Sequence, residues 1–311
     1  MRFGIVKCHG SGNDFPMIDA RELSLSGDEW AAVARALADR TGPVGGDGLL
    51  LLVSGDDRAA FGMVMRNSDG SEAETCLNGV RCVARAGFEA LGIDTATVRL
   101  KTSHADATRD ADLAPGVYTV RETAGPAGLS TAAWPIHGAP ERLVEAVLPM
   151  LDRERRFTAV TMPNPHLVHF VATVDEAELV RLGTICEGAP DWLPNRANVS
   201  FVEVRGDALF VRTFERGVGL TDSCGSAMAA STYAACLTGR IAWDRPTVVF
   251  NRGGLVRAFA EEDGMVTLSG NATYEWAGSV TVNLTTETAS DLVIERHFPD
   301  EIAAWEAAKR G

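Results

Sequence analysis

The stretch 214–227, FERGVGLTDSCGSA, contains the pattern on which the whole chain is built. A charged pair, Glu215-Arg216, is followed by a glycine turn. Cys224 then stands directly before Gly225-Ser226 and a run of alanines that predicts a buried helix. A cysteine in this position would lie at a helix N-terminus, where unpaired backbone N–H groups and the helix dipole favour a thiolate.

The same arrangement occurs earlier in the chain, at 67–79, NSDGSEAETCLNG. Here Cys76 precedes an apolar run over 80–91, and Gly92 is placed to end the helix that this run predicts. The sequence therefore predicts two cysteines that each open a helix.

The order of landmarks suggests an internal repeat. Asn13 and Asn164 are both expected in polar turns just after the first strand of their half, 151 residues apart, and Cys76 and Cys224 are 148 residues apart. A polar residue lies nine positions before each cysteine, namely Asn67 and Glu215. We therefore expect a duplicated α+β unit. If a pseudo-two-fold axis relates the halves, the two cysteines would face each other across a cleft.

Local patterns predict the other elements. A capping box at Ser26–Glu29 predicts a helix to about Ala38. A polar turn is expected at 163–166, and further helices at 140–148, 175–182 and 299–309. Strands are expected at 2–6, 15–19, 49–53, 61–65, 95–101, 159–162, 167–172, 200–204, 208–214, 246–250, 254–260, 264–269 and 278–284.

The 311 residues, 46% of them hydrophobic, are enough for two domains. We expect an N-terminal half over 1–125, containing Cys76 and joined by the C-terminal residues 286–311. The C-terminal half is expected over 126–285 and contains Cys224.

Charge and cysteine content exclude several classes of protein. A net charge of −13 argues against nucleic acid or an anionic membrane as partner, although a small anionic substrate can still bind through backbone amides and one arginine. No segment predicts a membrane span or signal peptide. Six cysteines without framework spacing indicate reduced thiols and a cytoplasmic protein. Cys76 and Cys82 lack the usual zinc-site spacing, and the glycine loop at 42–48 fits no nucleotide motif.

Two facing cysteines suit the inversion of a carbon that carries an acidic hydrogen. One thiolate removes the proton and the other thiol delivers a proton to the opposite face. The carbanion next to a carboxylate needs aimed donors, which the backbone amides at Leu77-Asn78 and Gly225-Ser226 can supply. No metal or organic cofactor is then required.

Simpler readings remain open at each position. A disulfide between Cys76 and Cys224 is one of them. The asparagines at 13, 67, 164 and 198 can each merely cap a turn, and His9 and His166 can be turn or packing residues. We expect the other four cysteines to be inert core residues: Cys8, Cys82, Cys186 and Cys236.

Five segments together give the chain a recognisable resemblance: HGSGNDF, RNSDGSEAETCLNGVRCVAR, PNPH, NVSFVEV and ERGVGLTDSCGSA. As a set they resemble the diaminopimelate epimerase family, which comprises cofactor-independent amino-acid epimerases with two cysteines. The resemblance implies two similar α+β domains, each a curled, barrel-like mixed sheet around a central helix, with the substrate in the cleft between them. It also implies a homodimer.

The resemblance assigns a role to each matching residue. Cys76 and Cys224 would be the two acid/bases, and His166 and Glu215 would adjust their pKa values. The amides at Leu77-Asn78 and Gly225-Ser226 would hold the reacting carboxylate. The remaining substrate contacts would come from Asn13, Asn67, Asn164, Asn198, Glu215 and Arg216.

The chain departs from the family pattern at a few positions. Leu77 stands where the family has a glycine after the first cysteine, which narrows the pocket and disfavours a positive φ. Pro163 replaces the usual glycine before Asn-Pro-His, and the tail after 286 is unlike the usual pattern.

Three functions follow as hypotheses. The first is interconversion of LL- and meso-diaminopimelate for lysine and peptidoglycan precursors, and Arg216 with the asparagines suits the second amino-acid head of that substrate. The second is a related racemase for another amino acid, such as histidine. The third is a non-catalytic amino-acid-binding or thiol-redox protein on the same scaffold.

Overall fold

A computed structural model describes residues 1–73, 76–162 and 164–310. The chain forms two units: unit 1 comprises Met1–Glu122 and Ser269–Gly311, and unit 2 comprises Thr123–Leu268. The chain passes from one unit to the other within β7 (Thr119–Thr123) and returns within β16 (Val266–Asn271).

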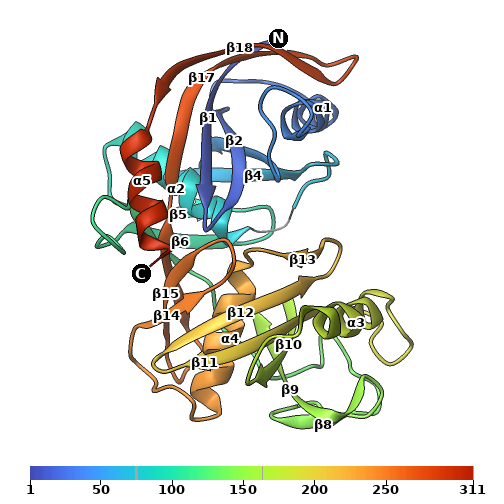
Figure 1. Cartoon of the computed structure of the whole chain (residues 1–311). Coiled ribbons are helices and arrows are strands. Elements are labelled where there is room, and N and C mark those ends of the chain that lie inside the picture. The colour runs from blue at the N-terminus through green and yellow to red at the C-terminus, as the bar shows by residue number, and fades with distance from the viewer. Residues whose placement is uncertain (74–75, 163, 311) are drawn as a thin grey trace. The chain divides into compact units, whose positions relative to one another are not determined.

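Unit 1 is built from both ends of the chain (Figure 1). Its helices are α1 (Gly27–Ala38), α2 (Leu77–Leu91) and α5 (Pro299–Ala308). Besides β7, its strands are β1 (Arg2–Gly10), β2 (Asn13–Asp19), β3 (Gly48–Ser54), β4 (Phe61–Asn67), β5 (Thr95–Arg99), β6 (His104–Arg109), β17 (Thr273–Asn283) and β18 (Thr288–His297). The sequence placed the segment that forms β17 in the second half, whereas β17 pairs antiparallel with β1 and lies in unit 1.

The sheet of unit 1 is mixed and runs in the order β18, β17, β1, β2, β3, β4, β5, β6, β7. Two pairs are parallel, β2 with β3 and β4 with β5. Helix α1 connects the first pair and α2 connects the second. Parallel neighbours need such crossover connections, so each helix has to lie on a face of the sheet.

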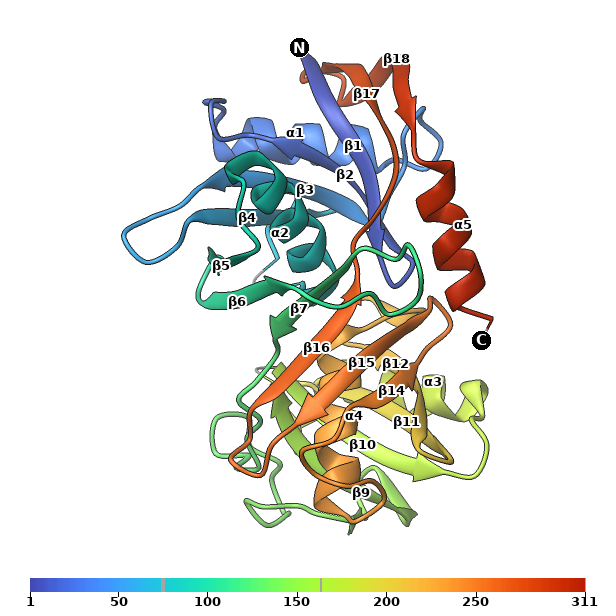
Figure 2. The same ribbon diagram turned by 90° about the vertical axis from the view of Figure 1, so that its left-hand side faces the viewer.

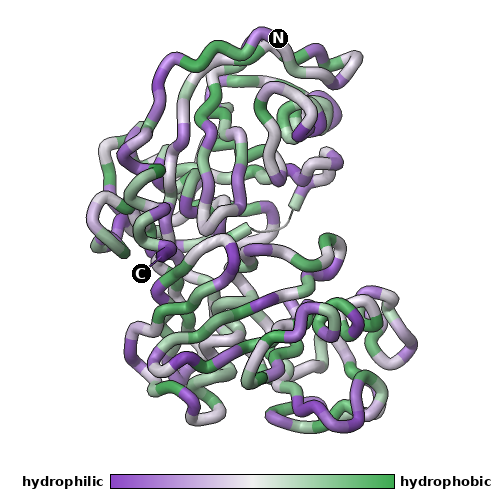
Figure 3. Tube along the Cα trace, in the orientation of Figure 1, coloured by the Kyte–Doolittle hydropathy of each residue, from purple (hydrophilic) through white to green (hydrophobic). Residues whose placement is uncertain are grey.

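Alternating side chains of unit 1 fill two separate cores, and the tube in Figure 3 shows hydrophobic and hydrophilic residues alternating along much of the trace. In β3, Leu50 and Leu52 pack with α2, whereas Leu49 and Leu51 pack with α1. Helix α2 contacts every strand from β1 to β6, so the sheet curls around it (Figure 2).

Unit 2 repeats this plan with a contiguous segment of chain. Its helices are α3 (Glu176–Glu187) and α4 (Gly225–Leu237). Besides β16, its strands are β8 (Ala146–Leu148), β9 (Asp152–Met162), β10 (Asn164–Val171), β11 (Asn198–Arg205), β12 (Ala208–Glu215), β13 (Gly219–Thr221), β14 (Thr247–Phe250) and β15 (Leu255–Ala260).

Six strands of unit 2 pair in the same way as six strands of unit 1. The run β9, β10, β11, β12, β14, β15 alternates antiparallel and parallel pairs in the same order as β1 to β6. Helix α3 takes the place of α1, and α4 that of α2. Helix α4 contacts all six of these strands, which explains why it is buried on every side. The predicted internal repeat is therefore present in the topology.

Local signals located the helices well. The capping box at Ser26 and Glu29 begins α1, and Gly92, with φ 67°, ends α2 in the left-handed conformation that glycine favours. The other predicted helices, 175–182 and 299–309, correspond to α3 and α5.

Three local predictions were wrong. The helix expected at 140–148 is absent from that described segment, because Glu145 adopts φ 45° and the short strand β8 follows. Asn164, Pro165 and His166, expected in a polar turn, begin β10 instead, where they pair with β9. Asn13, also expected in a polar turn, begins β2 and pairs with Gly10 of β1. Pro163 lies outside the described residues.

Candidate active site

Cys76 occupies the N-cap of α2 with an extended backbone, φ −150°. Its Sγ accepts a hydrogen bond from the backbone N–H of Gly79 at 3.4 Å, and it lies 3.7 Å from Oδ1 of Asn13 on β2. The side chain is half-buried. The predicted position of this thiol at a helix N-terminus is confirmed.

Asn13 belongs to a chain of side-chain hydrogen bonds around Cys76. Asn78 donates from Nδ2 to Asn13 Oδ1 at 3.3 Å, and Asn13 donates from Nδ2 to Asp47 Oδ2 at 2.5 Å. Arg81 in turn donates to Asn78 Oδ1 at 2.7 Å. Asp47 and Arg81 therefore fix the orientation of two predicted site amides. Neither residue was predicted from the sequence, although Asp47 lies in the glycine loop at 42–48.

The other two predicted residues of unit 1 differ in their surroundings. Asn67 donates from Nδ2 to Ser71 Oγ at 3.0 Å and so also caps its own turn. Leu77 is buried as the first residue of α2, and it is not among the described residues with positive φ. A leucine at this position therefore brings no backbone strain.

Cys224 holds the equivalent N-cap of α4, with φ −131°. Its Sγ is buried and lies 3.5 Å from Ser226 Oγ. Burial, and next the nearby carboxylate of Glu215, raise the pKa of Cys224 well above its ordinary value. This burial opposes the thiolate that the position at a helix N-terminus was expected to favour.

Glu215, at the end of β12, is the carboxylate that faces this thiol. It accepts a hydrogen bond from Thr221 Oγ1 at 2.6 Å, and Cys224 is a second hydrogen-bond partner. Burial raises the pKa of Glu215, while these two hydrogen bonds lower it. Thr221 was not predicted. It lies three residues before Cys224, and the antiparallel pairing of β12 with β13 brings it to Glu215.

Four further predicted residues form a polar group on β10, β11 and the turn after β12. His166 Nε2 lies 2.9 Å from Asn164 Oδ1, and Asn198 Oδ1 accepts the backbone N–H of Arg216 at 2.9 Å. His166 pairs in register with Asn198 on the neighbouring parallel strand. Burial, followed by the charge of Arg216, lowers the pKa of His166 to about 3, so its imidazole is neutral.

Two buried polar atoms of this group are unsatisfied. Within the described part of the chain, neither His166 Nδ1 nor Asn198 Nδ2 has a hydrogen-bond partner. A single buried donor or acceptor without a hydrogen-bond partner lowers the stability of a folded protein by about 1–3 kcal/mol. Such groups are consistent with a polar ligand that would supply the missing partners.

The backbone amides after each cysteine are placed as predicted. The first hydrogen bond within α2 runs from Val80 N–H to the Cys76 carbonyl at 2.9 Å, and that within α4 from Met228 N–H to the Cys224 carbonyl at 3.0 Å. The amides of Leu77-Asn78 and Gly225-Ser226 precede these bonds and therefore belong to the N-terminal turns that bind anions.

The remaining features of the described residues add little to the site. All six cysteines are free, and Cys8, Cys82, Cys186 and Cys236 are buried. The described side chains contain no group of three or more His, Cys, Asp or Glu residues suited to a metal. None of the helices in that part of the chain is long and apolar enough to cross a membrane.

Solved structures with low sequence identity share this architecture. A PhzF-family phenazine biosynthesis protein of Bacillus anthracis matches with a TM-score of 0.65 at 14% identity, covering 91% of this chain and 100% of that chain. A hydroxyproline epimerase of Agrobacterium vitis matches with a TM-score of 0.61 at 15% identity, covering 99% and 97%. These neighbours define the fold class as the α+β fold of curled mixed sheets with a central helix, as predicted.

Sequence comparison then gives the family. The family model for diaminopimelate epimerase matches residues 5–110 and 158–275. The chain is 35% identical over 287 residues to a diaminopimelate epimerase of Clostridium acetobutylicum, covering 90% of this chain and 86% of the relative. It is 38% identical over 285 residues to that of Ligilactobacillus salivarius, covering 86% and 87%. The chain belongs to the diaminopimelate epimerase family and is an isomerase of the epimerase class.

Proposed function

We propose that this protein interconverts LL- and meso-diaminopimelate, with Cys76 and Cys224 as the two acid/bases. One observation supports this above all: the two cysteines take the same N-cap position on the central helix of two units that share the same six-strand topology. Equivalent positions on repeated units suit a reaction whose forward and reverse directions exchange the roles of base and acid.

The chemistry needs one thiolate and one thiol. In one direction, a Cys76 thiolate removes the α-hydrogen as a proton, and the Cys224 thiol donates its proton to the opposite face of the same carbon. The raised pKa of Cys224 supports its role as the proton donor in this direction. In the reverse direction, deprotonated Cys224 is the base and Cys76 the acid, so no cofactor takes part.

Backbone amides would stabilise the intermediate. Negative charge on the α-carbon spreads into the adjoining carboxylate, which the amides of Leu77-Asn78 and Gly225-Ser226 would bind at two helix N-termini. Removing one such donor from other enzymes costs about 2.7–4 kcal/mol in transition-state stabilisation. These donors would make the α-hydrogen acidic enough for a thiolate to remove.

The polar group of unit 2 would select the substrate. Asn164, Asn198 and Arg216 would bind the distal amino and carboxylate groups, with Asn67 and Asn13 adding contacts from unit 1. A site with unsatisfied buried groups discriminates strongly against substrates that leave those groups unpaired. Diaminopimelate has the second amino-acid head that would satisfy them, whereas a simple monocarboxylic amino acid does not.

The wider biological role follows from this substrate. The product supplies lysine and peptidoglycan precursors, and the enzyme would work in the cytoplasm as a homodimer. A racemase acting on another amino acid is the second candidate, because Leu77 narrows the pocket where the family has glycine.

Proton NMR in deuterated water tests the proposal. Reduced protein with LL-diaminopimelate should exchange an α-hydrogen for deuterium and form the meso isomer. Exchange with another amino acid but not with diaminopimelate would keep the chemistry and reject the substrate. No exchange with any amino acid of a broad panel would reject the epimerase proposal and leave a binding protein.

Matched variants assign the cysteines. Cys76→Ala should abolish epimerisation whereas Cys82→Ala, on the same helix, should retain it. Cys224→Ala and Cys236→Ala form the same comparison on α4. Near-complete activity in Cys76→Ala or Cys224→Ala would contradict the two-base chemistry.

A further inference from the structure

The C-terminal segment of the chain lies beyond the family match, which ends at residue 275. It forms β18 and α5, and α5 packs along β17 in unit 1 (Figures 1 and 2). Only one side chain of α5 is fully buried, that of Trp305, which is 2% exposed. The contacts of this helix are therefore few and specific.

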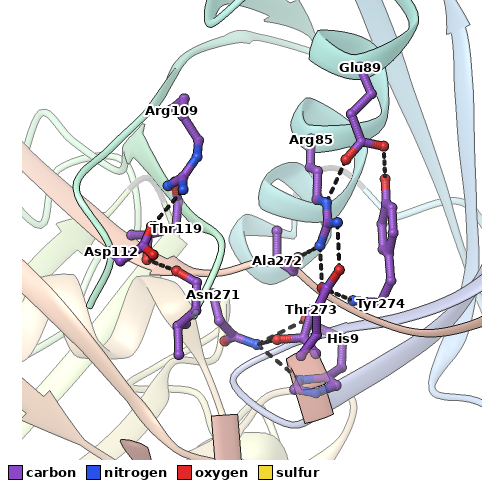
Figure 4. A network of polar contacts seen from close by, with 12 residues as sticks. His9, Arg85, Glu89, Arg109, Asp112, Thr119, Asn271, Ala272, Thr273 and Tyr274 are labelled. Carbon is purple, nitrogen blue, oxygen red and sulfur yellow. Dashed lines mark hydrogen bonds and ion pairs between the residues drawn. The ribbon is translucent and has the colours of Figure 1, made fainter. Parts of the chain in front are cut away.

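Glu301 ties α5 to the helix that carries Cys76. Its carboxylate accepts two hydrogen bonds from Arg85 of α2, at 2.5 and 2.8 Å, and a third from the backbone N–H of Tyr274 at 3.1 Å. Arg85 is buried. It also donates to the Ala272 carbonyl at 2.8 Å and lies over the Tyr274 ring at 3.7 Å (Figure 4). Bidentate pairs of this kind fix geometry as well as adding stability.

Trp305 contacts the turn that leads to Asn13. Its ring lies against His9, with the ring centroids 5.8 Å apart. His9 Nδ1 accepts the backbone N–H of Gly12 at 3.3 Å. Burial, and next the charge of Lys309 on α5, lower the pKa of His9 to about 4, so that the imidazole stays neutral and can accept this bond.

The turn is also held from β16. Asn271 accepts the backbone N–H of Ser11 at 2.7 Å and donates to the His9 carbonyl at 3.2 Å (Figure 4). Ser11 has φ 51° and Gly12 has φ 82°, so the turn keeps a left-handed conformation that the surrounding contacts have to maintain. Asn13, the next residue, is the side chain that contacts Cys76.

We propose that α5 is a positioning element of the active site, in which Glu301 holds α2 and Trp305 holds the turn from His9 to Gly12, so that together they set the geometry between Asn13 and Cys76. The inference rests on the proposed function for its catalytic consequence. Its structural part, the link between α5 and the turn, stands on the contacts alone.

The test compares Glu301→Gln with Asp300→Asn in the full-length protein. Both changes remove one negative charge from the first turn of α5, but Asp300 is exposed, and among the described residues no hydrogen bond or ion pair joins its side chain to α2. Glu301→Gln should raise KM for diaminopimelate and lower kcat/KM about tenfold, as expected for misplaced binding groups, while Asp300→Asn stays close to the wild type. Trp305→Leu should act in the same direction as Glu301→Gln. A merely destabilised protein would lose active fraction without a rise in KM.

Hydrogen–deuterium exchange of the peptide spanning residues 8–14 provides a readout that does not need catalysis. Exchange there should be about tenfold faster in Glu301→Gln than in Asp300→Asn. Unchanged exchange, or faster exchange with an unchanged KM, would overturn the inference and leave the proposed function intact. If the wild-type protein showed no epimerase activity, the proposed function would fail. Faster exchange in Glu301→Gln would still support the link from α5 to the turn.

Discussion

Replacing Arg81 by methionine would remove a fully buried guanidinium from the middle of unit 1. Arg81 on α2 forms an ion pair at 2.7 Å with Glu122 on β7, and neither side chain has any exposed surface. It also donates to Ser11 Oγ at 3.2 Å, to the Asn271 carbonyl at 3.1 Å and to Asn78 Oδ1 at 2.7 Å. The same residue thus contributes to stability and orients a site amide.

The loss of stability expected for Arg81→Met follows from the burial of its partner, Glu122. Leaving one member of a buried ion pair uncompensated costs about 3–5 kcal/mol. Glu122 already has one carboxylate oxygen without a partner among the described residues, and burial raises its pKa even against the attraction of Arg81. The carboxyl group can therefore bind a proton once Arg81 is gone, which places the cost near the lower limit, about 3 kcal/mol in the free energy of unfolding.

The double variant Arg81→Met with Glu122→Leu separates the two roles. Apolar replacement of a whole buried ion pair is often neutral or stabilising, so the double variant should recover most of the lost stability. It should not recover activity, because Asn78 and Ser11 still lack their donor.

Chemical denaturation followed by circular dichroism measures the free energy of unfolding of each variant. The value of kcat/KM for diaminopimelate measures the effect on the active site. A double variant no more stable than Arg81→Met would refute the argument about the ion pair. A double variant with full activity would refute the link to Asn78.

Three further outcomes are expected. Cys76→Ala and Cys224→Ala should each bind diaminopimelate in calorimetry while showing no interconversion of its LL and meso isomers, and interconversion at the wild-type rate would contradict their assignment. Burial lowers the pKa of His166 from 6.5 to about 3 in the folded state. Below pH 6.5 the unfolded chain therefore binds a proton that the folded chain does not, and the free energy of unfolding decreases as the pH is lowered. Between pH 7 and 5 this loss is about 2 kcal/mol, and in unfolding measurements at both pH values His166→Gln should lack it. Gly183→Ala, which would ordinarily stabilise a helix by about 1 kcal/mol, should lower the melting temperature, because its Cβ would lie 2.2 Å from Phe214 Cγ.

Features determined by neighbouring residues were predictable from the sequence. The N-cap positions of Cys76 and Cys224 follow from a polar, glycine-containing segment before an apolar run. The start of α1 at its capping box and the end of α2 at Gly92 are equally local.

Features determined by long-range pairing were not predictable. The raised pKa of Cys224 depends on burial and on Glu215, which β12 brings to it. The burial of Arg81 depends on β7 and on the turn at Ser11, both remote in sequence. Strand β18 was missed because its exposed, largely polar sequence has no clear alternation, and it is ordered by pairing with β17 and by contact with α1.

The central place of β1 in the sheet of unit 1 has a consequence for synthesis on the ribosome. Phe3 pairs with Val280, so β1 cannot pair with β17, one of its two neighbours, until almost the whole protein has been synthesised. At a translation rate of about 5–20 residues per second, that delay lasts about 14–55 s. Unit 2, whose residues are contiguous, completes its sheet earlier. During this interval one edge of β1 remains open to wrong partners, and a nascent chain released before β17 keeps that edge exposed.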